Sequence, residues 1–188
     1  MPRKSVPCKT LLLTFAALLI TFTQVHAQCK PPAKPAVPLS PAEQASTTLS
    51  GKTLTVYYCA PSMRGRKIMG GLVPYDKVWR TGANTATTFR TEANLRIGKQ
   101  IIPAGTYTLY SLPSPEGWKL IINKQVGQWG TVYNQSLDFA RVRMFEGVIP
   151  SAPVEKFKID FEHTRDNKTE LHFIWENTDV YVPITATD

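Results

Sequence analysis

The chain has 188 residues, of which 22 are Lys or Arg and 14 are Asp or Glu, and its formal net charge is +8. This length fits one domain that buries roughly two thirds of its unfolded surface, which is enough for a real core. The sequence contains no phosphate-binding loop, no G-x-G-x-x-G turn and no G-x-S-x-G elbow, which excludes the enzyme classes that depend on these motifs.

Residues 1–27 have the pattern of a secretory signal peptide, with three basic residues before an apolar run over residues 11–22. Cleavage after Ala27 predicts an exported protein, periplasmic or extracellular. The run is too short for an ordinary membrane-spanning helix, so we expect no transmembrane segment after its removal; an uncleaved anchor is the alternative. A lipid-modified start at Cys29 is disfavoured because Gln28 is too large for the position before a lipidated cysteine.

Residues 28–41 form a proline-rich linker, with five prolines among the last twelve residues. Such a segment is an extended, semi-rigid spacer that cannot lie inside a sheet. The folded domain is therefore predicted over residues 42–188. An exported compartment permits a disulfide between Cys29 and Cys59, and the alternative, in which Cys29 does not pair, stays open.

Apolar and polar residues alternate along the domain in eight or nine short runs, without a long helical period. Alternation gives one buried and one solvated face, which is typical of antiparallel strands. The sequence predicts an all-β fold, a single antiparallel β-sandwich or a partly closed barrel, with Phe157, Phe161, Phe173 and Trp175 buried. Asp166-Asn167 has the position of a hairpin turn. The predicted strands cover residues 53–58, 87–91, 95–97, 106–110, 118–122, 140–144, 157–161, 170–176 and 180–184.

Two long connections interrupt the strands, over residues 65–89 and 126–138. The first is too apolar for a flexible loop, and its glycines and prolines exclude a helix or strand. Such segments are normally ordered, packed loops that often carry function. Gly82 should adopt a backbone conformation that a side chain would strain. The side chains of Val78 and Trp79 should face inward, and those of Lys77 and Arg80 outward.

Basic residues concentrate in residues 61–100, which hold eight Lys or Arg against two Asp or Glu. A basic face favours anionic partners such as phosphates, acidic glycans or lipid head groups. An ordinary solvated surface is the alternative. Nucleic acid is not an expected partner.

Several motifs, taken in order, resemble a known family. Residues 61–87 read PSMRGRKIMGGLVPYDKVWRTGANTAT, and IIPAGTYTLYSLP, WKLIINK, QWG and LHFIWENTDVYVPI follow. Over roughly residues 40–184 the chain resembles a bacterial family of secreted proteins, the domain-of-unknown-function family numbered 2911. It departs from the family pattern at three positions. Arg is expected in place of Ala60, Gly or Asn in place of Asp76, and Glu in place of Thr85. The resemblance implies location and fold, and assigns no chemistry.

The two long connections hold the candidate binding residues. Trp79 and Trp129 can stack on a sugar ring or cap the core. Arg80 and Asn84 can hold a ligand or hydrogen-bond the loop's own backbone. We expect a binding module of the cell envelope for an anionic or carbohydrate-like ligand, with no cofactor, and the lack of a catalytic set argues against an enzyme. The candidate residues are Arg64, Arg66, Trp79, Arg80, Asn84 and Trp129.

Two other functions stay open. One is a purely structural domain. The other is a hydrolase of envelope polymers, which needs a pair of carboxylates that one sequence cannot place. The candidate carboxylates are Glu43, Asp76, Glu92 and Asp138.

A zinc site would need three or four convergent ligands. His163 and His172 could supply two, with Asp160, Glu162 or Asp166 as a third. We expect no metal site, because His163 lies at a predicted hairpin end and His172 on the solvent face of a predicted strand.

Overall fold

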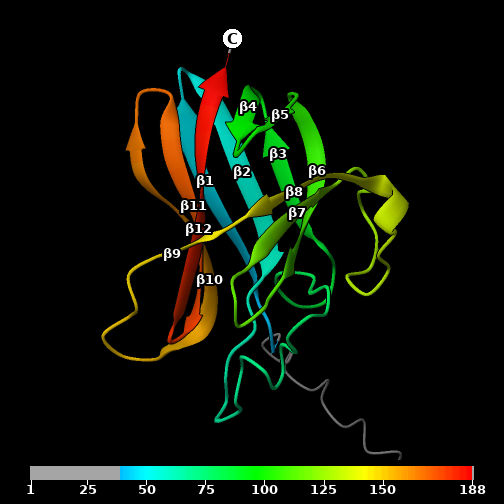
Figure 1. Ribbon diagram of the computed structural model, residues 1–188, viewed down its shortest axis with the longest axis vertical. Coiled ribbons are helices and arrows are strands. Elements are labelled where there is room, and N and C mark those ends of the chain that lie inside the picture. The colour runs from blue at the N-terminus through cyan, green and yellow to red at the C-terminus, as the bar shows by residue number, and fades with distance from the viewer. Residues whose placement is uncertain (1–38, 188) are drawn as a thin grey trace, which may run out of the picture. The chain divides into compact units, whose positions relative to one another are not determined.

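The computed structural model describes residues 39–187, which form two antiparallel sheets packed face to face (Figure 1). One sheet has the strand order β1-β2-β3-β6-β7-β8; the other has β10-β11-β12-β4-β5, with the short β9 beside β12. Neither sheet closes into a barrel, so the all-β sandwich is confirmed and the barrel alternative does not hold. The predicted signal peptide, most of the predicted linker and Cys29 lie outside the described residues.

The strands of the first sheet are β1 (Ala42–Leu49), β2 (Lys52–Cys59), β3 (Thr87–Thr91), β6 (Gly105–Leu112), β7 (Lys119–Asn123) and β8 (Asp138–Arg143). Those of the second sheet are β4 (Asn94–Ile97), β5 (Gln100–Ile102), β9 (Phe145–Glu146), β10 (Val154–Arg165), β11 (Lys168–Glu176) and β12 (Thr178–Thr187). A single 3-10 turn, η1 (Gln135–Leu137), precedes β8. Within residues 39–187 there is no helix long and apolar enough to cross a membrane.

Two tight hairpins fix the register of four strands. Ser50 and Gly51 have φ of 48° and 76° and join β1 to β2, a backbone geometry that matches the twist of paired strands. Asp166 and Asn167 join β10 to β11, as the sequence predicts. Strand β1 is absent from the sequence prediction because its inward face is barely more apolar than its exposed face: the inward positions are Glu43, Ala45, Thr47 and Leu49.

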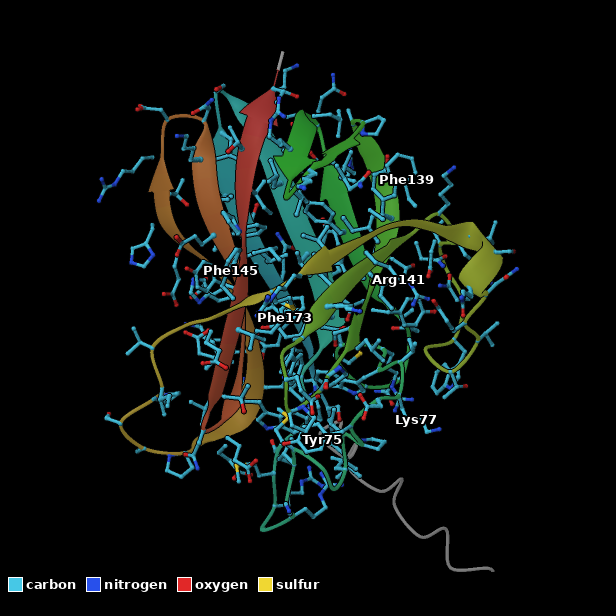
Figure 2. The ribbon with its side chains drawn as sticks, viewed as in Figure 1. Tyr75, Lys77, Phe139, Arg141, Phe145 and Phe173 are labelled. Carbon is cyan, nitrogen blue, oxygen red and sulfur yellow. The ribbon has the colours of Figure 1, made fainter. Side chains whose placement is uncertain are left out.

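The core lies between the sheets, where Figure 2 shows the ring of Phe173. Phe157, Phe173 and Trp175 are buried, as predicted. Phe161 was also predicted to be buried, but it is only partly covered, because it lies farther along β10 than Phe157, toward the hairpin, where the burial of the strand falls off.

The substitution Trp175→Ala should lower the free energy of unfolding by about 3–5 kcal/mol, because it removes a large buried side chain and leaves a cavity. Urea denaturation followed by circular dichroism measures this change. Trp129→Ala is the matched control, since the Trp129 side chain is exposed. A similar loss of stability in both variants would contradict the core position of Trp175.

Candidate functional site

The connection between β2 and β3, residues 60–86, is an ordered and packed loop, as the sequence predicts. Ile68 and Val73 are fully buried, and the amide of Val73 donates a 2.9 Å hydrogen bond to the Ile68 carbonyl. The loop lies at one end of the sandwich, where Figure 2 labels Tyr75 and Lys77. Its backbone bonds and buried apolar groups hold the loop in one conformation, so the polar side chains on it have fixed positions.

Trp79 joins this loop to the core. Its backbone exchanges two hydrogen bonds with Ser111 of β6, of 2.8 and 2.9 Å, so the loop here continues the sheet. Its ring stacks on that of Trp175, with 5.9 Å between the ring centroids. It also meets the Phe157 ring edge-on, with 5.0 Å between the centroids. These contacts support a core-capping role for Trp79, which also lines a pocket beside Arg80.

The next residues make a tight turn against the end of β2. Ala83 donates a 3.0 Å hydrogen bond to the Cys59 carbonyl, and the Thr87 hydroxyl donates one of 2.7 Å to the Thr81 carbonyl. Gly82 has φ of 153°, and a Cβ atom there would lie 3.0 Å from the Cys59 carbonyl oxygen. The predicted need for glycine at position 82 is therefore confirmed.

Arg80 was predicted to extend into solvent, but it is only half-exposed. Its aliphatic part lies against Gly130, where a Cβ atom would clash with it. Its Nε atom is buried and makes no hydrogen bond to any residue in 39–187. A buried donor without an acceptor is rare in folded proteins, and it costs about 1–3 kcal/mol.

A pocket of about 390 Å³ opens beside Arg80. Five of the six candidate binding residues, Arg64, Arg66, Trp79, Arg80 and Asn84, line it, together with Leu39, Ser40, Pro61, Ser62, Leu72, Gly82, Ala83 and Trp175. The sequence motifs did not point to Pro61, Ser62 or Leu72, because only the folded loop turns them toward the same space.

Trp129, the sixth candidate, does not line the pocket. It lies next to it, because Gly130 donates a 3.0 Å hydrogen bond to the Asn84 carbonyl and Trp129 forms a β-bridge with Thr85. Its side chain is 54% exposed. The second long connection therefore supplies a solvent-facing indole close to Asn84.

The pocket is positively charged. None of Arg64, Arg66 and Arg80 forms an ion pair within the described part of the chain. Arg64 donates to the Leu39 carbonyl at 3.0 Å, and Arg66 donates to the carbonyls of Met63 and Ser62, so these two also support the loop. No Asp or Glu is among the described residues that line the pocket, although the Glu155 carboxylate, just outside it, accepts a 2.9 Å hydrogen bond from the backbone amide of Arg64.

The basic stretch predicted over residues 61–100 does not form one face. Its members on the loop lie at one end of the sandwich, whereas β4, which carries Arg96, lies at the other end (Figure 1). Arg90 approaches Glu92 to 4.0 Å. The prediction of a single basic surface is therefore wrong, because the chain crosses the whole sheet along β3.

The four carboxylates considered for hydrolysis do not come together. Glu43 pairs with Lys156 on one edge of the first sheet, and Asp138 pairs with Arg141 on the opposite edge strand. Each of these four carboxylates lies on a different segment of the chain and shares no partner with the others; they are Glu43, Asp76, Glu92 and Asp138.

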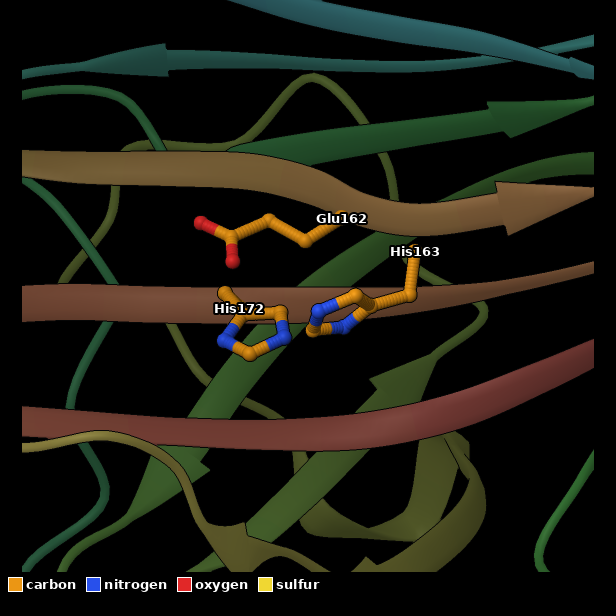
Figure 3. A group of neighbouring side chains, drawn as sticks. All are labelled: Glu162, His163 and His172. Atoms are coloured by element: carbon orange, nitrogen blue, oxygen red, sulfur yellow. The ribbon is translucent and has the colours of Figure 1, made fainter.

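A second cluster of polar side chains lies on the outer face of the other sheet (Figure 3). His172 was predicted to face solvent, but its side chain is only 4% exposed. It is covered because its ring stacks on that of Tyr181, with 4.9 Å between the ring centroids, and because it contacts two carboxylates. Its Nδ1 atom lies 2.8 Å from Asp179, and its Nε2 atom lies 3.3 Å from Glu170.

Glu170 also lies 2.7 Å from the Nδ1 atom of His163. Burial of the Glu170 carboxyl would raise its pKa, but hydrogen bonds from His163 and His172 outweigh this and hold the pKa below its usual range. Glu170 and His172 are two residues apart on one strand, so their shared face could have been read from the sequence. Asp179 could not, because its approach depends on how β11 and β12 are paired.

Comparison with known proteins identifies one family. The profile described as "Protein of unknown function (DUF2911)" matches residues 40–184. No curated protein and no solved structure matches the chain.

The substitution Gly82→Ala should destabilise the fold, because it adds both backbone strain, of about 1–3 kcal/mol, and a close contact with the Cys59 carbonyl. Gly117→Ala is the matched control, since Gly117 has φ of 129° but no atom lies near its would-be Cβ. Thermal unfolding of both variants should show the larger loss for Gly82→Ala. Equal losses would mean that the turn against β2 is less tightly packed than described.

Proposed function

This chain belongs to the DUF2911 family of proteins of unknown function, and we propose that it is a binding module of the cell envelope whose pocket, beside Arg80, takes a small anionic ligand such as an acidic sugar. Export of the protein, which the pattern of residues 1–27 favours, is part of this proposal.

The observation that carries the proposal is the set of three guanidinium groups, of Arg64, Arg66 and Arg80, that line the pocket without an ion pair within residues 39–187 and without a carboxylate among the described lining residues. The Nε atom of Arg80 is covered by the protein, so a ligand carboxylate or phosphate would bind this guanidinium through its outer Nη atoms. The guanidinium group is planar and presents parallel N–H groups, so it can bind such an anion through two hydrogen bonds at once.

The rest of the lining supports the same class of ligand. Arg64 and Arg66 add two further positive charges, neither in an ion pair within the described residues, and Asn84 adds an amide that can donate or accept. Leu72 and Trp79 give the pocket apolar surface, which a sugar ring can contact through its non-polar face. An anion at one end and an apolar face at the other describe an acidic sugar better than a bare inorganic anion.

The hydrolase hypothesis finds no comparable support. Glycoside hydrolysis needs two carboxyl groups on either side of the scissile bond, and the part of the pocket formed by described residues contains none. A binding role therefore fits the geometry better than a catalytic one.

Isothermal titration calorimetry with glucuronate, glucose 6-phosphate and neutral glucose at low ionic strength tests the proposal. We expect the two anions to bind and glucose to bind far more weakly. Arg80→Ala should reduce anion affinity on the order of tenfold to a hundredfold, because a hydrogen bond to a charged group contributes about 1.5–3 kcal/mol.

Arg165→Ala is the matched control, since Arg165 is exposed at the β10–β11 hairpin, at the opposite end of the sandwich. Its anion affinity should match that of the unaltered chain. If Arg80→Ala instead lowers the melting temperature while anion binding stays the same, Arg80 supports the loop and the proposed site is wrong.

A further inference from the structure

Glu162, His163 and His172 lie together on the outer face of the second sheet, far along the chain from the pocket beside Arg80 (Figure 3). Glu162 and His163 belong to β10, and His172 belongs to the paired strand β11. Each offers a ligand atom, and these atoms lie within 4.8 Å of one another. We propose that this cluster is a binding site for a divalent transition metal of the zinc type.

A local distortion of β10 brings two adjacent residues to the same side. Neighbouring side chains on a regular strand point to opposite faces, so Glu162 and His163 would normally be separated by the sheet. Here the pairing with β11 shifts register between Glu162 and Arg165, and His163 has a positive φ of 51°. Bulges of this kind re-aim a side chain, and a strained non-glycine residue within one suggests a functional reason.

His172 is prepared as a metal ligand. Its ring is buried and stacked on Tyr181, and its Nδ1 atom lies 2.8 Å from the buried carboxylate of Asp179. When Nδ1–H donates to that carboxylate, the lone pair of the imidazole is on Nε2, which faces the cluster. A carboxylate that orients a histidine in this way is a regular feature of zinc sites.

The surroundings of His163 and His172 are rich in carboxylates. The Nε2 atom of His172 lies 3.3 Å from a Glu170 oxygen, and the same oxygen lies 2.7 Å from the Nδ1 atom of His163. Glu162 adds another carboxylate. Three carboxylates, those of Glu162, Glu170 and Asp179, thus surround two imidazoles, and a divalent ion between the nitrogens and Glu162 would offset part of this negative charge.

The geometry is close to that of a bound ion. Zinc holds nitrogen and oxygen ligands at about 2.0–2.2 Å, so in a tetrahedral site the ligand atoms are about 3.3 Å apart. The ligand atoms of the cluster, now up to 4.8 Å apart, have to converge by up to about 1.5 Å. His163 can turn toward the ion because its side chain is 66% exposed, although it is held by Glu170. Two imidazoles with carboxylate favour zinc-type ions over Ca²⁺ and Mg²⁺, which prefer all-oxygen sites.

Titration of the full chain, freed of metal with a chelator, tests the proposal with Zn²⁺ in calorimetry and with Co²⁺ in absorption spectroscopy. We expect one ion per chain, visible bands of a tetrahedral Co²⁺ complex, and no comparable binding of Mg²⁺. His163→Ala and Glu162→Gln should each weaken Zn²⁺ binding at least tenfold. Both positions are at least partly exposed, so the variants should fold, which near-ultraviolet circular dichroism checks.

Asp76→Asn is the matched control, since Asp76 is exposed on the loop between β2 and β3, away from the cluster on β10 and β11. Its Zn²⁺ affinity should be unchanged. The proposal is overturned if the unaltered chain binds no Zn²⁺. It is also overturned if Zn²⁺ binds with equal affinity to the His163→Ala and Glu162→Gln variants, which would place the ion elsewhere on the chain.

Discussion

The packing of Trp79 against the core is the constraint on which the conformation of the loop over residues 60–86 depends. A connection as long as residues 60–86 would lose much conformational entropy on ordering, and burial of its apolar residues has to offset that loss. The Trp79 ring stacks on Trp175, while its backbone extends the sheet through Ser111. Aromatic pairs of this kind add about 0.5–1.5 kcal/mol beyond the burial of area. Arg80 follows directly, so the core itself sets the position and the partial burial of its guanidinium group.

Much of the fold could be predicted from sequence because alternation is a local signal that each strand carries by itself. The strand at Leu171 to Trp175 and the hairpin at Asp166-Asn167 are examples. Part of the candidate site could also be predicted, because most of its residues are neighbours on one loop. The burial of Arg80 was missed because it depends on Gly130, which belongs to a distant segment. The burial of His172 was missed because it depends on the pairing of β11 with β12, which places Tyr181 and Asp179 against its ring and which alternation does not reveal.

The domain thus carries two polar sites of opposite character on one rigid scaffold. The pocket beside Arg80 is rich in guanidinium groups and has no carboxylate among its described lining residues, so it suits an anion. The cluster around His172 combines imidazoles with carboxylates, so it suits a cation. Both depend on irregular backbone, the turn at Gly82 in one case and the bulge at His163 in the other. Irregular segments held in place by regular sheets are where binding residues are commonly found in β-sandwich proteins.

In the proposed site, the guanidinium group of Arg80 binds the ligand anion. Nuclear magnetic resonance of the arginine Nε–H groups observes this guanidinium group directly, with Arg80→Lys to identify its signal. On addition of glucuronate, the Arg80 signal should shift, while the signal of Arg165 stays in place. An Arg80 signal that does not respond to glucuronate would contradict the proposed site.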